Sequence, residues 1–241
     1  MKIRRAKSGP FVEQPYFTDS DVESIVTNEL SRVGLLPTNP EPIRVDRFIE
    51  KRFGIVPRYD FIQDGILGFT KFGAKGPEEV VVSRSLSEED SRVAERRINS
   101  TLAHEVGHML LHGQIFSLQR RAGTHPLLQN DLDEDRQTIL CRSDAVGSMP
   151  ESARVHRYDG RWWEFQANMV IGVLLLPRQL VYEALEPLLV SKGLLGLKLL
   201  EDTMREEAAG RLSDIFNVNP AVARIRIEKL HPINNDQQLA L

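Results

Sequence analysis

The sequence predicts an α+β fold that is mostly helical and contains one small β-sheet. Apolar residues recur at helical spacing over most of the chain, in residues 19–35, 43–53, 87–112, 161–176, 180–189, 195–207 and 208–230. Residues 55–85 instead contain short apolar runs between Gly- and Pro-containing turns, a pattern typical of strands. We therefore expect this one segment to form the sheet and the remainder to form helices around it.

Residues that break or cap helices set the expected ends of these elements. Three prolines in residues 36–42 separate the first two helices, and Gly54 suits the end of the second. Glu88 and Glu89 suit the first turn of the helix that follows the sheet. Pro177 ends the helix over residues 161–176, which is apolar on nearly all sides and is therefore expected to be buried.

The same pattern divides the chain into three parts. Residues 1–18 are basic and lack a clear period, so we expect a flexible N-terminal arm. Residues 19–178 contain the sheet and the main helices, and residues 179–241 form a C-terminal helical region. Within the main part, residues 114–160 mix charges with scattered Gly and Pro, which indicates a long excursion with at most short elements.

Composition narrows the classes of function and location. The net charge of -3 gives no overall electrostatic case for binding nucleic acid or an acidic membrane. The single cysteine, Cys141, excludes an internal disulfide and fits a reducing compartment. The N-terminus lacks the apolar stretch of a secretory signal, and the most apolar segment, residues 169–176, is well short of the ~20 residues that cross a bilayer. We therefore expect a cytoplasmic protein without membrane association.

The segment His104-Glu105-Val106-Gly107-His108 carries a metal-binding pattern. Two histidines four residues apart lie on one face of a helix and can share one ion, while Glu105 lies at the flank, where it can reach an attacking water. This spacing predicts zinc ligands at His104 and His108 and a catalytic base at Glu105. A glycine inside a helix is about 1 kcal/mol less favourable for helix formation than alanine. Its presence at Gly107 suggests that another part of the molecule packs closely there. The alternative is an ordinary surface helix.

A catalytic zinc site needs a third protein ligand. His112 is ~12 Å from His104 along a straight helix, too far to share one ion, so we interpret it as structural or as a residue that orients a ligand. Glu164 is the better candidate, since a carboxylate in an apolar helix is costly to bury unless it binds a cation. Asn168, one turn later, can orient a ligand by hydrogen bonding. The alternative for Glu164 is an exposed pair with Arg161.

Together the two segments resemble the ImmA/IrrE family of zinc metallopeptidases. HEVGHMLLHG matches the HExxH helix of that family, and the later segment matches its E-x-x-A-N and L-L-x-P pattern at Glu164, Ala167, Asn168, Leu174, Leu175 and Pro177. The resemblance covers residues 43–177 and implies a zincin-like domain with zinc bound by His104, His108 and Glu164. One departure is the 55 residues between His108 and Glu164, a longer segment than in compact members.

The resemblance also implies a substrate. Members of the family cleave a helix-turn-helix transcriptional repressor and so relieve repression in a stress, mobile-element or phage-defence response, and a CapP-like branch is associated with antiphage systems. We therefore expect a regulatory metalloendopeptidase that uses Zn²⁺, with Mn²⁺ as a possible substitute. The main alternative is a non-cleaving, metal-bound sensor or binding module that acts on a transcription regulator or DNA. A structural zinc protein would need a closed site with four ligands.

Several further residues are candidates for a role at this site. Cys141 lies between the two ligand segments, and our hypothesis is that its thiolate is an inhibitory fourth zinc ligand; an inert cysteine is the alternative. An oxyanion donor is expected among His156, Tyr158 and Tyr182. The strands around Phe69 and Val81 are expected to offer a sheet edge to an extended substrate.

Residues 211–230 suggest a helix-turn-helix with Arg224, Arg226 and Lys229 on its second helix. DNA binding is one interpretation, but three basic charges support it only weakly. A structural helical pair that docks a repressor is the interpretation we favour.

Overall fold

The computed structural model describes residues 2–5, 13–115, 138–142, 162–192 and 197–233, and it confirms the α+β class. The longer helices are α1 (Asp19–Arg32), α2 (Val45–Phe53), α3 (Arg84–Glu88), α4 (Arg92–Leu111), α6 (Trp162–Leu175), α7 (Arg178–Leu185), α8 (Arg205–Phe216) and α9 (Pro220–Leu230). The strands are β1 (Lys2–Arg5), β2 (Glu13–Tyr16), β3 (Arg58–Asp60), β4 (Ile66–Gly73), β5 (Gly76–Ser83), β6 (Thr138–Arg142), β7 (Leu189–Lys192) and β8 (Leu197–Leu200).

The main sheet has the strand order β3-β5-β4-β6, with β3 parallel to β5 and the other neighbours antiparallel. The prediction that Phe69 and Val81 offer a free edge is wrong, because they lie on β4 and β5, which are both internal strands. Strand β6 causes the difference. It comes from the long excursion, which showed no strand pattern in sequence, and it pairs with β4.

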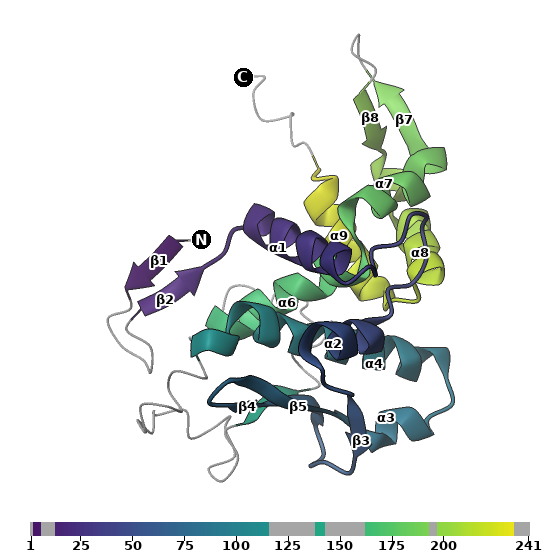
Figure 1. Ribbon diagram of the computed structural model, residues 1–241. Coiled ribbons are helices and arrows are strands. Elements are labelled where there is room, and N and C mark those ends of the chain that lie inside the picture. The colour runs from purple at the N-terminus through teal and green to yellow at the C-terminus, as the bar shows by residue number, and fades with distance from the viewer. Residues whose placement is uncertain (1, 6–12, 116–137, 143–161, 193–196, 234–241) are drawn as a thin grey trace.

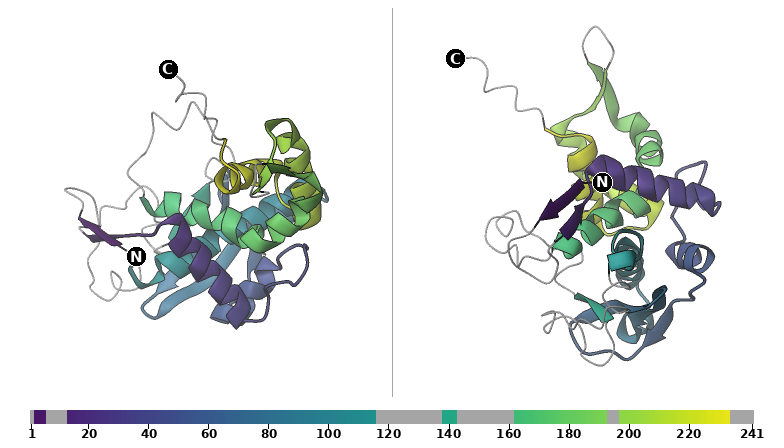
Figure 2. Two further views of the ribbon diagram at one scale, coloured as in Figure 1. Left: turned by 90° about the horizontal axis from the view of Figure 1, so that it is seen from above. Right: turned by 60° about the vertical axis from the view of Figure 1, so that its left-hand side comes forward.

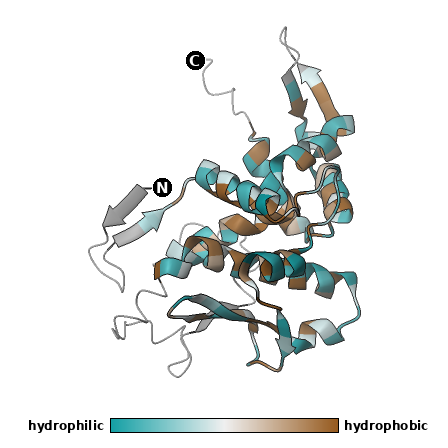
Figure 3. Cartoon of the chain, in the orientation of Figure 1, coloured by the Kyte–Doolittle hydropathy of each residue, from teal (hydrophilic) through white to brown (hydrophobic). Residues whose placement is uncertain are grey.

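The helices lie in layers over this sheet (Figure 1). Helix α4 packs on β4 and β5, α6 packs on α4, and α1 and α9 pack on α6, as the turned views also show (Figure 2). Ser91 starts α4 by accepting a hydrogen bond from the Ala94 backbone N–H. Helix α6 is enclosed on most sides, and Figure 3 shows its largely hydrophobic composition. The layers therefore bury the predicted metal segment of α4 between the sheet and α6.

The N-terminal segment differs from the expected arm. Strands β1 and β2 pair as an antiparallel hairpin, and the side chain of Phe17 joins the hydrophobic core. Thr18 and Asp21 then form a reciprocal capping box at the start of α1. Strands of four residues are too short to show a period in sequence, which explains the missed hairpin.

The C-terminal part is helical, but one predicted helix is wrong. Residues 195–207 contain β8 and the first turn of α8 instead, and β8 pairs with β7 in a hairpin that projects from the C-terminal helices (Figure 1). The buried hydrophobic residues of α7, α8 and α9 belong to the same cluster as those of α1, α4 and α6. The boundary expected at residue 178 therefore does not separate two hydrophobic cores. Within the described part of the chain, no helix has the length and apolarity needed to cross a bilayer.

Candidate metal centre

The two histidines of the HEVGH segment lie on one face of α4, as their spacing predicts. Their side chains are fully buried, and the Nε2 atoms of His104 and His108 are 3.0 Å apart. Gly107 explains how a second helix reaches them. A Cβ atom at this position would lie 2.7 Å from the Cα and 2.8 Å from the carbonyl oxygen of Ala167, so the backbones of α4 and α6 are in direct contact. The close packing that Gly107 suggested in sequence is confirmed.

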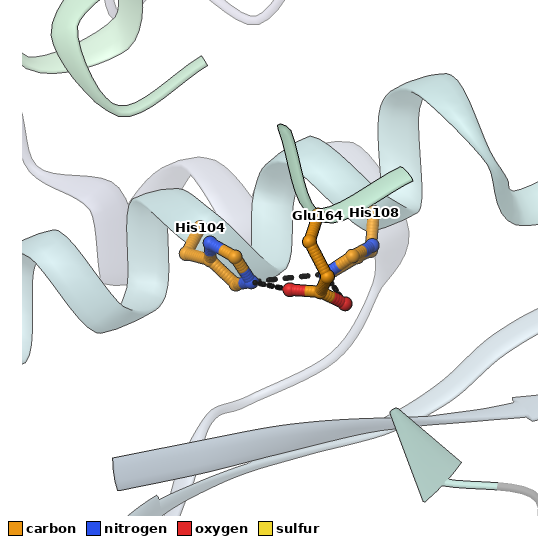
Figure 4. Close-up of side chains that lie close together, drawn as sticks. All are labelled: His104, His108 and Glu164. Atoms are coloured by element: carbon orange, nitrogen blue, oxygen red, sulfur yellow. Dashed lines mark hydrogen bonds and ion pairs between the residues drawn. The ribbon is translucent and has the colours of Figure 1, made fainter. Parts of the chain in front are cut away.

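This contact brings Glu164 to the histidines, which it reaches from the first turn of α6 (Figure 4). Its Oε2 is 3.1 Å from Nε2 of His104, and its Oε1 is 3.4 Å from Nε2 of His108. In a tetrahedral site with bonds of about 2.0–2.1 Å, ligand atoms lie roughly 3.3–3.4 Å apart. The three residues therefore fit one shared divalent ion.

The charges of the three side chains are strongly coupled. Burial opposes ionisation of Glu164, but the adjacent imidazoles of His108 and His104 hold the pKa of its carboxyl well below the ordinary value. Burial also opposes protonation of His104, yet its bonds to Glu164 raise its pKa overall. At His108 burial prevails, and the pKa is lowered. A bound dication would stabilise the same ionised carboxylate and would require both imidazoles to be neutral.

Side chains outside the predicted ligand set contact the Nδ1 atoms of both histidines. Oδ1 of Asn168 is 2.9 Å from Nδ1 of His104, which is the orienting contact expected from the sequence. Nδ1 of His112 is 3.2 Å from Nδ1 of His108, so His112 contacts a ligand residue while its own pKa is lowered to about 3, mainly by burial. Gln166, which the sequence interpretation overlooked, contacts the other ring nitrogen of His112.

Glu105 is fully buried beside the histidines. Its Oε2 accepts a hydrogen bond from Oγ1 of Thr70 on β4 at 2.5 Å, and within the described residues its Oε1 has no hydrogen-bond partner. Burial raises the pKa of Glu105 to about 7, although the charge of His104 and the Thr70 bond act in the opposite direction. A carboxyl group with a pKa near neutrality can both accept and release a proton. Thr70 could not be found from sequence, because only the tertiary packing of β4 on α4 brings it to Glu105.

Each of the other predicted site residues either lies far from Glu164 or is not fully described in the structure. Cys141 lies on β6 with its backbone opposite Gly68 of β4, but its side chain falls outside the described part of the structure. His156 and Tyr158 also lie outside the described residues. Tyr182 is on α7, beyond the far end of α6 from Glu164, where its hydroxyl donates to the carbonyl of Leu230. Since α6 runs for about 16 Å after Glu164, the expectation that Tyr182 stabilises an oxyanion at this site is wrong.

The basic residues of α9 are all engaged with carboxylates. Arg224 makes a forked contact with Glu206, and Lys229 pairs with Asp19. Arg226 is buried, where Nη1 pairs with Glu23 and Nε donates to the carbonyl of Leu176. These pairs neutralise the charges that DNA phosphates would need, so they weaken the electrostatic case for DNA binding.

Comparison with known proteins adds no family assignment. The sequence matches no family model, and no curated protein has significant sequence similarity to it. The resemblance of the two ligand segments therefore stays a prediction. What bears on function is the geometry of His104, His108 and Glu164, which can hold a metal ion.

Proposed function

We propose that this chain is a zinc-dependent endopeptidase in which His104, His108 and Glu164 bind the metal and Glu105 is the catalytic base. The observation that carries the proposal is the convergence of three ligand atoms, within 4.8 Å of one another, beside a buried carboxyl group. Two imidazoles and one carboxylate are a ligand set of peptidase zinc sites that keep a fourth position open. The Glu164 side chain remains 20% exposed, so solvent reaches one of the three ligand residues. Manganese is the expected substitute metal.

Glu105, Thr70 and Asn168 have separate roles in the proposed hydrolysis. When bound, a zinc ion polarises a carbonyl group and lowers the pKa of water to about 7. Glu105 accepts a proton from the attacking water and delivers it to the leaving amine, a role that suits a pKa of about 7. Thr70 holds Oε2 of Glu105 and leaves Oε1 for the proton transfer. Asn168 keeps His104 oriented for binding.

The substrate proposal rests on the resemblance of the ligand segments to the ImmA/IrrE family. That resemblance supports a zincin-like domain and a helix-turn-helix transcriptional repressor as the substrate, cleaved to relieve repression in a stress, mobile-element or phage-defence response. The pairing of the α9 cations with carboxylates favours a protein partner over DNA.

The decisive experiment incubates the purified chain, with zinc or manganese, with the repressor encoded beside its own gene. Mass spectrometry of the products compares the wild type with Glu105→Gln. We expect cleavage by the wild type and a rate at least about 100-fold lower for the variant, since a general base contributes roughly 10²–10⁴-fold. The variant keeps all three metal ligands, so its zinc content should be unchanged.

Two outcomes would count against the peptidase. Products that form equally with Glu105→Gln would mean that the site does not perform the cleavage. Stoichiometric zinc without Glu105-dependent product would favour the alternative of a non-cleaving sensor or binding module.

A further inference from the structure

A series of buried and partly buried hydrogen bonds connects the N-terminal strand β2 with the candidate ligand His108. Nε2 of Gln166 donates to the carbonyl oxygen of Pro15 at 3.0 Å, and Oε1 of Gln166 lies 3.1 Å from Nε2 of His112. Nδ1 of His112 lies 3.2 Å from Nδ1 of His108. The side chains of Gln166, His112 and His108 are all buried.

The Pro15 carbonyl determines which atom donates and which accepts in each hydrogen bond of this series. A peptide carbonyl can only accept, so Pro15 requires the amide nitrogen of Gln166 to face it. The amide oxygen must then face His112, which makes Nε2 of His112 the donor. A neutral imidazole carries one N–H, and burial disfavours the charged ring, so Nδ1 of His112 accepts. The remaining donor is the Nδ1–H of His108.

We infer that the Pro15 carbonyl, Gln166 and His112 form a relay that holds His108 in the tautomer with its proton on Nδ1 and its Nε2 lone pair facing Glu164 and His104. This inference rests on the proposed metal site and assigns positioning roles to Gln166, His112 and the N-terminal strand. Metal-binding histidines commonly donate their second ring N–H to such a partner, which fixes the tautomer and raises the basicity of the ligand.

The two candidate ligands are held by separate means. His104 is held by Asn168 on α6, whereas His108 depends on a bond that ends outside the metal-binding helices, on β2. The relay predicts that residues 13–16, although distant in sequence from the HEVGH segment, are part of the metal centre. Because the two means are independent, His104 provides an internal control.

The test uses two variants of Gln166. Gln166→Met has a similar size but cannot bond to either neighbour. Gln166→Glu keeps an oxygen that accepts from Nε2–H of His112 in either ionisation state, and its protonated form also donates to the Pro15 carbonyl, so it preserves the bond that orients His112. A relay predicts that Glu is the better replacement, whereas a role in packing alone predicts that Met is better.

The first readout is the tautomer state of each histidine in metal-free, ¹⁵N-labelled protein at about pH 8, where free imidazoles are neutral. In the wild type we expect the proton of His108 on Nδ1 and that of His112 on Nε2. In Gln166→Met the proton of His108 should distribute over both nitrogens while His104 is unchanged, and in Gln166→Glu the wild-type pattern should return. A wild type with the His108 proton on Nε2 would overturn the inference.

The second readout is zinc affinity by competition with a chromophoric chelator. Loss of an outer partner typically lowers metal affinity by about 10–100-fold, so we expect that loss in Gln166→Met and less than about 5-fold loss in Gln166→Glu. Equal affinity in the wild type and Gln166→Met would overturn the relay. If the wild type itself fails to bind zinc, the proposed function fails, but the tautomer readout still decides whether the relay exists.

Discussion

The two ends of helix α6 both bury charged side chains, but with opposite consequences. At its C-terminal end, Arg226 is buried against the carboxylate of Glu23 and the carbonyl of Leu176, so its charge is largely balanced by the protein. At its N-terminal end, the carboxylate oxygens of Glu164 lie 3.1 and 3.4 Å from the Nε2 atoms of His104 and His108, so the three ligand atoms converge on one point. A cation at that point would balance the second cluster, whereas the first already contains its own.

The partners of a buried charge indicate whether it has a structural or a ligand-binding role. Burial alone does not distinguish a ligand from a structural tether, because the side chains of Glu164 and Arg226 are both largely removed from solvent, at 20% and 2% exposure. The distinction comes from the partners: opposite charges that pair with each other stabilise an interface, while acceptors that converge indicate a missing cation. Substitutions at the two ends of α6 should therefore have separate effects on stability and on metal binding.

The largest expected effect on stability is at Arg226. Arg226→Met should lower the free energy of unfolding by about 3–5 kcal/mol, because it leaves Glu23 beside a buried interface without its main partner. The affinity for zinc should remain at the wild-type value, since the substitution is at the opposite end of α6. Denaturant unfolding measures the stability, and a zinc titration measures the affinity. A loss of both would show that the two ends of α6 are not independent.

A smaller effect is expected where α4 crosses α6. Gly107→Ala should destabilise the protein by about 2–3 kcal/mol despite the better helix propensity of alanine, because the new methyl group would meet the backbone of Ala167. Zinc affinity should fall as well, since the helices that carry His108 and Glu164 must separate.

Gly210→Ala is the matched control for this substitution. Gly210 lies within α8, and a methyl group added there would meet no atom of the neighbouring elements within 4 Å, so alanine should stabilise the protein by about 0.5–1 kcal/mol. Similar changes in stability at both glycines would contradict the direct backbone contact between α4 and α6.

One effect on stability depends on pH, because it arises from the protonation of Glu105. Burial raises the pKa of Glu105 from 4.5 to about 7, so in this range the folded metal-free protein holds a proton that the unfolded chain has released. The contribution of Glu105 is therefore most favourable below pH 4.5 and is lost as the pH rises toward 7. Glu105→Gln should then be more stable than the wild type by about 3 kcal/mol near pH 8, with little difference near pH 4.5. A difference that does not vary with pH would contradict the shift.

Local geometry explains which parts of the site were predictable. The spacing of His104 and His108 places both on one helical face whatever the rest of the fold does, and Gly107 indicated the close contact with α6. Glu164 and Asn168 were found because a carboxylate and an amide in an apolar helix need partners. The same reasoning applies to Gln166, which lies between them and could have been identified.

Pairing between distant segments explains what was missed. Strand β6 becomes a strand only beside β4, and Thr70 reaches Glu105 only through the packing of the sheet on α4. The hairpins β1–β2 and β7–β8 consist of four-residue strands, which are too short for a period. The pairing of the basic residues of α9 could not be predicted, because their acidic partners, Asp19, Glu23 and Glu206, are far away in sequence.

The most direct test of the metal centre is a zinc titration of metal-free protein with a competing chelator. It should compare the wild type with His108→Ala, Glu164→Gln and the distant Arg226→Met. The wild type and Arg226→Met should bind one equivalent of zinc with equal affinity, and each ligand variant should bind more than about 100-fold less tightly, since losing a ligand exceeds the cost of losing an outer partner. Zinc binding that survives both ligand substitutions unchanged, or that is absent from the wild type, would contradict the assignment of His104, His108 and Glu164 as one metal site.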